Sequence, residues 1–315
     1  MSEKSWQPVE GIIPPLITPL VGPDALDVAG LERLVERVVQ GGVHAVFILG
    51  TSGEAPSLSY RLRRELIRRV CAQVRGRVPV WVGITDTAMA EAVALGRCAA
   101  EAGAQALVTA PPYYFPAGQP ELIHFVRLLA AELPLPLILY NMPQMVKVRF
   151  EPETLAELVR IENVVGLKDS SGDLEYFRRA VELARARSDW RVWIGPEEWL
   201  AEALELGGHG GVNGGAQIVP AWFTGLYDAH CRGDRARVKE LQNRIRQLGR
   251  IYTVGRHASA VVKGLKCALA WLGVCRDEMA PPFEPFRDPE RERVRAVLVE
   301  LGLLEKEPVE KSGTL

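Results

Sequence analysis

The sequence has almost no net charge and no long apolar run. Its 315 residues include 38 Lys and Arg against 39 Asp and Glu, which gives a formal net charge of −1. A protein with this balance has no overall attraction for nucleic acid or for an anionic membrane, so we expect neither as a partner. No stretch approaches the ~18 consecutive apolar residues of a membrane helix, and the first residues, MSEKSWQPVEG, lack the apolar region of a signal peptide. These absences predict a cytoplasmic protein.

Cysteine and histidine are few and form no metal or disulfide pattern. The five cysteines are odd in number and contain no C-x-x-C pair, and the five histidines lack the spacing of metal ligands. This pattern favours reduced thiols over a disulfide or zinc framework, so we expect no metal site. The cysteines are Cys71, Cys98, Cys231, Cys267 and Cys275.

Lysine is also scarce. Only 8 of the 38 basic residues are Lys, and the other 30 are Arg. Between Lys4 and Lys239 the chain contains just two lysines, Lys147 and Lys168. A surface cation can be either residue type, whereas an amine that must lose its proton and attack a carbonyl has to be Lys.

What the sequence does contain is a series of short apolar runs. Hydrophobic residues make up 48% of the chain, enough to fill one large core or two ordinary ones. Most runs are apolar at consecutive positions, as in strands that are buried on both faces of a parallel sheet. The first and last contain Pro or Gly and are the weakest strand predictions. Eight strands are predicted, over Gly11–Thr18, His44–Gly50, Val78–Thr85, Ala104–Ala110, Pro136–Asn141, Val164–Lys168, Trp190–Gly195 and Gly210–Gly214.

Segments with helical periodicity separate these strands. Val28–Val39 is apolar at i, i+3, i+4 and i+7, with Asp27 as N-cap and Gly41-Gly42 as the stop, and a similar helix follows Ser59. Strict βα alternation predicts a parallel sheet, and eight units over about 230 residues match a closed (β/α)8 TIM barrel. An open doubly wound sheet is the alternative, but it usually carries a Gly-rich turn after the first strand, where this chain has TPLVGPD.

After Pro220 the alternation stops, and only helices are predicted. We therefore divide the chain into a (β/α)8 barrel at residues 1–219, a C-terminal helical extension at residues 220–304 and a polar tail at residues 305–315. The predicted C-terminal helices cover Ala221–Cys231, Ala236–Tyr252, Ala258–Trp271 and Asp288–Leu301.

The active site of a β/α barrel forms at the carboxyl ends of its strands, which directs attention to Lys168. This residue ends the sixth predicted strand, in VVGLKDSSGD. Burial disfavours the ammonium form and so favours the free amine, which is the nucleophile. The alternative is a strand-end lysine that pairs with the adjacent Asp169.

Polar residues also follow the second, fourth and fifth strands. GTSGE follows strand two; its glycines let the backbone approach a ligand, and Thr51 and Ser52 offer hydroxyls and amides to a carboxylate. Tyr140 ends strand five and is suited to shuttle protons, and Tyr113 and Tyr114 follow strand four in PPYY. Taken singly, GTSGE is also explained by a capped turn, Tyr140 is better explained by a core aromatic, and PPYY is equally explained by packing or an interface.

The motifs GTSGE, PPYY, YNMP and GLKDSSGD occur in this order after strands two, four, five and six. Together they resemble the dihydrodipicolinate synthase / N-acetylneuraminate lyase family of class I, Schiff-base aldolases. The resemblance covers nearly the whole chain, including the C-terminal helices. It implies a metal-independent carbon–carbon lyase that acts on a small 2-oxo acid.

The resemblance also implies a catalytic role for four residues. Lys168 matches the lysine that forms an imine with the C2 keto group of pyruvate or another 2-oxo acid, so no cofactor is needed. Tyr140 matches the tyrosine that shuttles protons at the imine and at the reacting oxygen. Thr51 matches the hydroxyl that relays protons between Tyr140 and a second tyrosine, which Tyr114 matches. In the family this second tyrosine comes from a neighbouring subunit, and members are commonly homotetramers built as dimers of dimers.

Substrate-binding residues are implied in the same way. Ser52, with the amides of Thr51 and Ser52, matches the group that holds the pyruvate carboxylate. Val212 matches a position whose backbone carbonyl faces the bound pyruvate. Ser170 matches a contact to polyol substrates, and Glu198 lies in GPEE, which resembles the acidic pair with which sialate lyases bind sugar hydroxyls.

The fifth residue after the YNMP tyrosine bears on which member of the family this is. Dihydrodipicolinate synthases carry an Arg there for the carboxylate of aspartate semialdehyde, and this chain has Met145. Losing such a charge-assisted contact typically costs ~1.5–3 kcal/mol. Lys147 and Arg149 are the cations that could replace it. Sialic-acid and keto-deoxy-sugar lyases have an apolar residue at that position, but Gly214 and Gly215 stand where sialate lyases carry hydroxyl side chains.

Three functions remain open. We favour a pyruvate-releasing aldolase that reversibly cleaves a 2-keto-3-deoxy sugar acid or a related 4-hydroxy-2-oxo acid to pyruvate and an aldehyde. The second is a dihydrodipicolinate synthase that condenses pyruvate with aspartate semialdehyde, or a dehydratase that uses the same imine. The third is a non-catalytic barrel that binds a ketoacid.

Overall fold

Eight parallel strands form the centre of the computed structural model, which describes residues 6–305. The order of the strands in the sheet is β1-β10-β9-β8-β7-β6-β5-β4, so the first and the last of them in sequence are neighbours. The strands are β1 (Gly11–Ile12), β4 (Val46–Ile48), β5 (Val80–Gly83), β6 (Ala106–Thr109), β7 (Leu137–Asn141), β8 (Val164–Asp169), β9 (Arg191–Ile194) and β10 (Gly210–Gly211).

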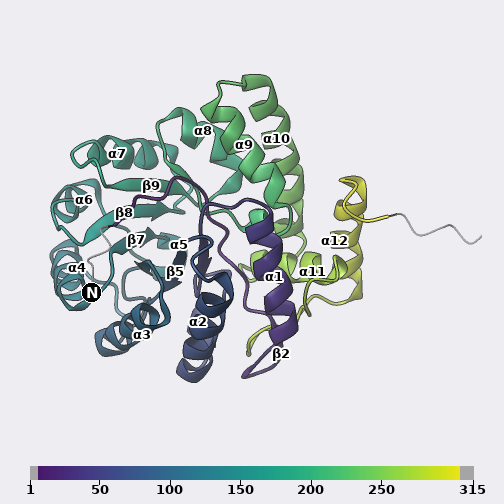
Figure 1. Cartoon of the computed structure of the whole chain (residues 1–315), viewed down its shortest axis with the longest axis horizontal. Helices are drawn as coiled ribbons and strands as arrows, with labels where there is room; N and C mark the ends of the chain where they lie inside the picture. The colour runs from purple at the N-terminus through teal and green to yellow at the C-terminus, as the bar shows by residue number, and fades with distance from the viewer. Residues whose placement is uncertain (1–5, 306–315) are drawn as a thin grey trace, which may run out of the picture.

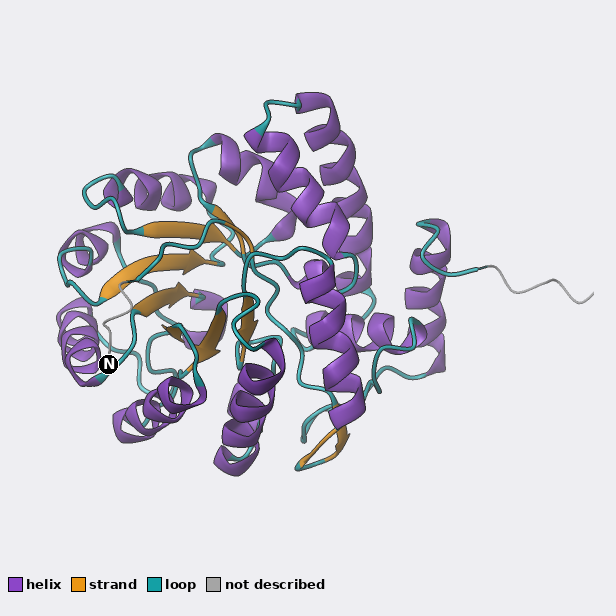
Figure 2. Ribbon diagram, in the orientation of Figure 1, coloured by secondary structure: helices purple, strands orange, loops and turns teal. Residues whose placement is uncertain are grey.

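The sheet closes into a barrel between the N-terminal strand and β4. Pro15 and Phe47 form a parallel bridge; the amide of Leu16 donates to the Phe47 carbonyl at 2.8 Å, and the amide of Phe47 donates to the Pro14 carbonyl at 3.1 Å. Each strand is then joined to a neighbour on both sides, and Figure 2 shows the strands inside a ring of helices. The predicted TIM barrel is confirmed, and the open doubly wound alternative is wrong.

The first and last barrel strands are shorter than the sequence predicts. Pro14 and Pro15 follow β1 and have no N–H to donate to a ladder. β10 pairs with β1 at Gly210 and Gly11, where a Cβ on Gly210 would lie 1.9 Å from the Gly11 carbonyl oxygen. Glycine permits this close approach of two backbones, but it has no side chain to extend the strand.

Helices cover the outside of the barrel (Figure 1). Asp27 caps the first as predicted, because its side chain accepts from the Gly30 amide, and Ser59, after which the second helix is predicted, caps it by accepting from the Leu62 amide. A small hairpin of β2 (Leu20–Gly22) and β3 (Ala25–Leu26), which the sequence does not predict, precedes the first helix. The outer helices are α1 (Val28–Gln40), α2 (Tyr60–Val74), α3 (Met89–Ala102), α4 (Gln119–Glu132), α6 (Pro152–Leu158), α7 (Leu174–Ala184) and α8 (Leu200–Glu205). The short helix α5 (Pro143–Val146) follows β7 and lies nearer the centre of the barrel in Figure 1.

The predicted helical region after Pro220 is present. One helix stops early: α10 ends at Leu248, and a 3-10 turn over Gly249–Thr253 directs the Tyr252 hydroxyl to Glu197, 2.9 Å away. The division of the chain at residues 219 and 220 stays a prediction, and residues 306–315 of the predicted tail lie outside the described residues. The C-terminal helices are α9 (Pro220–Cys231), α10 (Arg235–Leu248), α11 (Ala260–Trp271) and α12 (Asp288–Glu300).

Large side chains fill the barrel interior. Trp81 on β5 and Trp193 on β9 meet edge to face with ring centroids 4.8 Å apart, and both are buried together with Phe47 and Tyr140. Because the interior is packed, open space for a ligand begins at the mouth of the barrel. Among residues 6–305, every helix is too short or too polar to cross a bilayer.

Candidate active site

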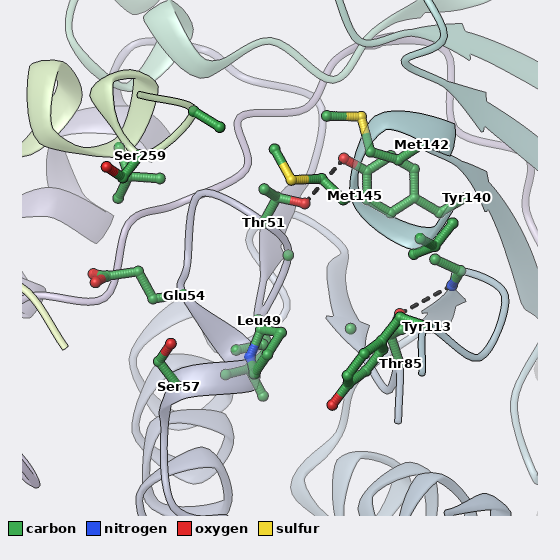
Figure 3. Close-up of a pocket in the computed structure, with 18 of the residues that line it drawn as sticks. Leu49, Thr51, Glu54, Ser57, Thr85, Tyr113, Tyr140, Met142, Met145 and Ser259 are labelled. Atoms are coloured by element: carbon green, nitrogen blue, oxygen red, sulfur yellow. Dashed lines mark hydrogen bonds between the residues drawn. The ribbon is translucent and has the colours of Figure 1, made fainter. Parts of the chain in front are cut away.

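A cavity of about 530 Å³ opens at the carboxyl ends of the strands. Its walls come from the loop after β4, from the segment after β7 and from residues 257–283 of the C-terminal region. Thr51, Tyr113 and Tyr140 line it (Figure 3). The cavity therefore lies where a β/α barrel places its active site.

Lys168 and Tyr140 lie side by side on neighbouring strands; Tyr140 lines the cavity, whereas Lys168 does not belong to its lining. They are register partners of β8 and β7, and Lys168 Nζ is 3.9 Å from the centroid of the Tyr140 ring and 5.3 Å from that of Phe47. Lys168 and Tyr140 are each only 5% exposed. The amine is thus held between aromatic rings and away from bulk water, a setting that suits a lysine nucleophile.

The adjacent Asp169 carboxylate is committed to other partners. Its Oδ1 accepts from Asn141 Nδ2 at 2.8 Å and from the Ser171 amide at 3.1 Å, and its Oδ2 accepts from Ser171 Oγ at 3.0 Å. Burial raises the pKa of Asp169 to about 6, although these hydrogen bonds act in the opposite direction. The network ties together the ends of β7 and β8 and so fixes the backbone that carries Tyr140 and Lys168. The sequence predicts no role for Asn141; its place directly after Tyr140 in YNMP is the only signal.

The loop after β4 brings Thr51 to the Tyr140 hydroxyl, and the two side-chain oxygens are 3.2 Å apart (Figure 3). Leu49 and Glu54, on either side of this loop, have φ values of 59° and 55°. Left-handed backbone in a residue other than glycine costs on the order of 1–3 kcal/mol and persists only where the surroundings impose it. Contacts with the rest of the protein must therefore hold the backbone of this loop in its strained conformation.

A buried ion pair between Glu54 and Lys266 holds the loop in place. Lys266 of α11 is fully buried, contacts Glu54 Oε1 through Nζ, and donates to the Glu278 carbonyl at 2.5 Å. The amide of Ala280 donates to Glu54 Oε2 at 2.8 Å. Burial lowers the pKa of Lys266, and the Glu54 carboxylate opposes that shift. Glu54 thus ties the loop to the C-terminal helices, a role that the sequence predicts for neither residue.

Two amides of the loop are free to bind an anion. The amides of Gly53 and Glu54 donate to the carbonyls of Gly50 and Thr51, each at 3.1 Å. Within residues 6–305, the amides of Thr51 and Ser52 have no acceptor. Both residues are half-buried, and Thr51 but not Ser52 belongs to the cavity lining. Adjacent N–H groups of this kind match the oxygens of a carboxylate.

Tyr114, the second tyrosine of the predicted relay, does not line the cavity of its own chain. Tyr114 is 72% exposed and meets Phe115 edge to face, with ring centroids 5.2 Å apart. Tyr113 lines the cavity of its own chain instead. Val212 is buried after β10, where its amide donates to the Ile194 carbonyl at 2.8 Å.

The two acidic residues of GPEE, Glu197 and Glu198, lie in different environments. Glu198 is exposed, whereas Glu197 is buried and accepts from the Gly215 amide at 2.7 Å and from the Tyr252 hydroxyl at 2.9 Å. Burial raises the pKa of Glu197 to about 7. Neither Glu198 nor Ser170 belongs to the cavity lining, so their predicted contacts to a polyol stay predictions. Between residues 6 and 305, no group of three or more His, Cys, Asp or Glu is arranged to hold a metal ion.

The chain matches the dihydrodipicolinate synthetase family over residues 8–301. It belongs to this family. A 4-hydroxy-tetrahydrodipicolinate synthase from Methanoculleus marisnigri is 33% identical over 93% of this chain and 99% of its own. One from Thermus thermophilus is 36% identical over 94% of this chain and 98% of its own. The predicted family and enzyme class, a carbon–carbon lyase of the Schiff-base aldolase type, are confirmed.

Solved structures of the family superpose closely on the chain. The dihydrodipicolinate synthase from Bacteroides thetaiotaomicron is 49% identical, with a TM-score of 0.90 over 93% of this chain and 99% of that one. A prophage protein of the family from E. coli K12, solved in complex with pyruvate, is 27% identical, with a TM-score of 0.89 over 94% of this chain and 99% of that one. The barrel with its C-terminal helices is therefore the fold of the family.

Proposed function

We propose that the chain is a pyruvate-dependent aldolase in which Lys168 is the nucleophile. The observation that carries this proposal is the placement of a nearly buried amine 3.9 Å from the centre of the Tyr140 ring, with the Tyr140 hydroxyl 3.2 Å from Thr51 Oγ1. A nucleophile, a proton shuttle and a relay hydroxyl thus meet at the mouth of the barrel. The covalent imine with Lys168 takes the place of a cofactor.

The reaction follows from these positions. The Lys168 amine attacks the C2 keto group of a 4-hydroxy-2-oxo acid, and loss of water leaves an iminium ion. Tyr140 takes the proton of the C4 hydroxyl, the C3–C4 bond breaks, and its electron pair moves to the iminium, which becomes an enamine. An aldehyde leaves, C3 is protonated, and water releases pyruvate and the free amine. Condensation is the reverse sequence.

The free amides of Thr51 and Ser52 are the proposed binding site for the carboxylate of pyruvate, together with the Ser52 hydroxyl. The Val212 carbonyl is the proposed contact on the opposite strand end. This arrangement fixes the keto carbon of the bound acid beside Lys168, which is worth a large part of the rate enhancement in enzymes of this type.

The proton relay needs a second chain in this proposal. Tyr114 is exposed beside Phe115 and lies away from the cavity of its own chain. We propose that it completes the relay through Thr51 in a neighbouring subunit, within a homotetramer built as a dimer of dimers.

The proposed substrate is a 4-hydroxy-2-oxo acid, the class that includes the 2-keto-3-deoxy sugar acids. Met145 lines the cavity at the position where the resemblance places the arginine of the synthases. Neither possible substitute reaches the cavity: Lys147 is exposed outside it, and Arg149 Nε pairs with Glu151 Oε1 at 3.1 Å. No cation therefore replaces the missing arginine among the described lining residues.

A synthase is the second candidate, because the relatives from Methanoculleus marisnigri and Thermus thermophilus carry that name. It would condense pyruvate with aspartate semialdehyde through the same imine, and a dehydratase would use that imine as well. The two activities are separated by one pair of assays. We expect pyruvate release from a simple 4-hydroxy-2-oxo acid, 4-hydroxy-2-oxopentanoate, measured with a coupled lactate dehydrogenase. Condensation of aspartate semialdehyde without any pyruvate release would favour the synthase.

A further inference from the structure

The cavity reaches well beyond the atoms that react. Its volume of about 530 Å³ falls in the range of sites that enclose drug-sized ligands, whereas pyruvate has only three carbons. The remaining space is continuous with Tyr140 and Thr51, so it is available to the aldehyde half of the substrate. The character of its wall therefore decides which aldehydes bind.

This wall is apolar on both sides. Met142, Met145 and Val146 contribute from the segment after β7, and Figure 3 shows the two methionines beside the hydroxyl of Tyr140. The C-terminal region contributes Val262, Met279 and Phe283. Methionine and phenylalanine side chains adapt to aliphatic and aromatic groups, and they offer no hydrogen bond to a charged group.

The polar groups of the lining are few and partly engaged. The Glu54 carboxylate is neutralised by Lys266, and Thr85 Oγ1 already accepts from the Ala110 amide at 2.9 Å. His257 is exposed, and Ser57, Ser259 and Tyr113 add one hydroxyl each, while the hydroxyls of Thr51 and Tyr140 pair with each other. Among the described lining residues there is neither Lys nor Arg. A second carboxylate would lose its water here without gaining a cation, and a row of sugar hydroxyls would gain fewer hydrogen bonds than it gives up in water.

We infer that the aldehyde which reacts with pyruvate in this cavity is uncharged and apolar beyond its carbonyl group, as in an aliphatic or aromatic aldehyde. The inference rests on the proposed function. The enamine carbon C3 of the Lys168 adduct bonds to the aldehyde carbon, the aldehyde oxygen takes a proton, and water then hydrolyses the imine to release a 4-hydroxy-2-oxo acid. The step needs no oxidant, reductant or further reactant.

The test compares aldehydes of similar size that differ in polarity. The enzyme is given saturating pyruvate with pentanal, benzaldehyde, glyceraldehyde or succinic semialdehyde, and kcat/KM is taken from product formation measured by chromatography. We expect kcat/KM to be at least about tenfold higher for pentanal and benzaldehyde than for the two polar aldehydes, because one methylene in an apolar pocket changes discrimination by about tenfold or more.

A parallel sample with pyruvate and borohydride tests the aldolase mechanism separately from the preference for apolar aldehydes. An adduct at Lys168 together with a preference for glyceraldehyde or succinic semialdehyde overturns the apolar aldehyde and leaves the aldolase. Absence of an adduct overturns the aldolase and the inference with it.

Two variants test the wall directly. Met145→Arg places a cation in the cavity, and we expect it to raise kcat/KM for succinic semialdehyde relative to pentanal by about tenfold. Gln144→Arg is the matched control, because Gln144 is exposed and lies outside the cavity lining. Equal changes of the ratio in both variants would contradict a specific role of the Met145 wall.

Discussion

Single residues carry the proposed chemistry, and Tyr140 is the one whose hydroxyl is the proposed proton shuttle. It lies 3.2 Å from Thr51 Oγ1, and its ring packs on the Lys168 amine. Tyr140→Phe keeps the ring and removes only the hydroxyl. We expect kcat to fall by about 100- to 10,000-fold, the usual contribution of a positioned acid–base group.

Steady-state kinetics with circular dichroism as a folding check measure this loss. Tyr227→Phe is the control, since Tyr227 lies on α9, where its ring meets His44. A Tyr140→Phe enzyme as active as the Tyr227→Phe control would remove the proton shuttle from the mechanism.

At this scale the sequence predicts a candidate nucleophile, which stays a prediction, but it does not predict the contacts that surround it. Lys168 stands out because lysine is scarce and because the residue ends an apolar strand. The ion pair of Glu54 and Lys266 is not predictable in the same way, because its partners are far apart in the chain and neither lies in a charged pattern that indicates pairing. Asn141 and Asp169 likewise reveal their hydrogen bond only when β7 and β8 are neighbours.

Elements hold these residues in place, and the contact between the GTSGE loop and α11 is the clearest example. Lys266 is fully buried against Glu54, so Lys266→Met leaves a buried carboxylate without its cation. We expect this variant to lose about 3–5 kcal/mol of unfolding free energy in urea titrations. The double variant Glu54→Gln with Lys266→Met is expected to recover part of the loss. Surface substitutions usually change the unfolding free energy by no more than about 0.5 kcal/mol. A change this small for Lys266→Met would show that the ion pair does not hold the loop in place.

A second link between elements gives a pH dependence. Burial raises the pKa of Glu197 from 4.5 to about 7 in the folded protein, so the folded state binds the proton more tightly than the unfolded state. The stabilising contribution of the protonated form is complete below the unfolded pKa and is lost as the pH rises to about 7. One pKa unit corresponds to about 1.4 kcal/mol, so the loss is on the order of 3 kcal/mol.

Glu197→Gln removes this titration while keeping the size of the side chain. We expect the unfolding free energy of wild type to fall more between about pH 5 and about pH 8 than that of the variant. Urea unfolding at the two pH values measures both differences. Parallel behaviour of the two proteins would show that Glu197 ionises normally.

Element boundaries follow the sequence where local signals are strong. Asp27 and Ser59 begin α1 and α2 as predicted, because N-capping depends on residues within one turn. The end of α10 is not predicted, since the 3-10 turn that follows Leu248 is set by the tertiary contact of Tyr252 with Glu197. β1 and β10 are shortened by proline and by the close approach of Gly11 and Gly210.

At the scale of the whole molecule, Tyr114 and Phe115 form an exposed aromatic pair that we propose is used between chains. Tyr114 and Phe115 are 72% and 80% exposed. We expect the chain to be an oligomer in light scattering, and we expect Tyr114→Phe to keep that mass while lowering kcat at least about tenfold. A monomeric wild type with full activity would contradict the shared relay.

The central claim is that Lys168 forms the imine, and trapping tests it most directly. The protein is incubated with pyruvate, reduced with borohydride and digested, and the adduct is mapped by mass spectrometry. Lys168→Arg keeps the charge without the nucleophilic amine, and Lys147→Arg makes the same change at the exposed lysine outside the cavity. We predict an adduct on Lys168 in wild type and in Lys147→Arg, and none in Lys168→Arg. An adduct on another residue, or one that survives Lys168→Arg, would contradict the mechanism.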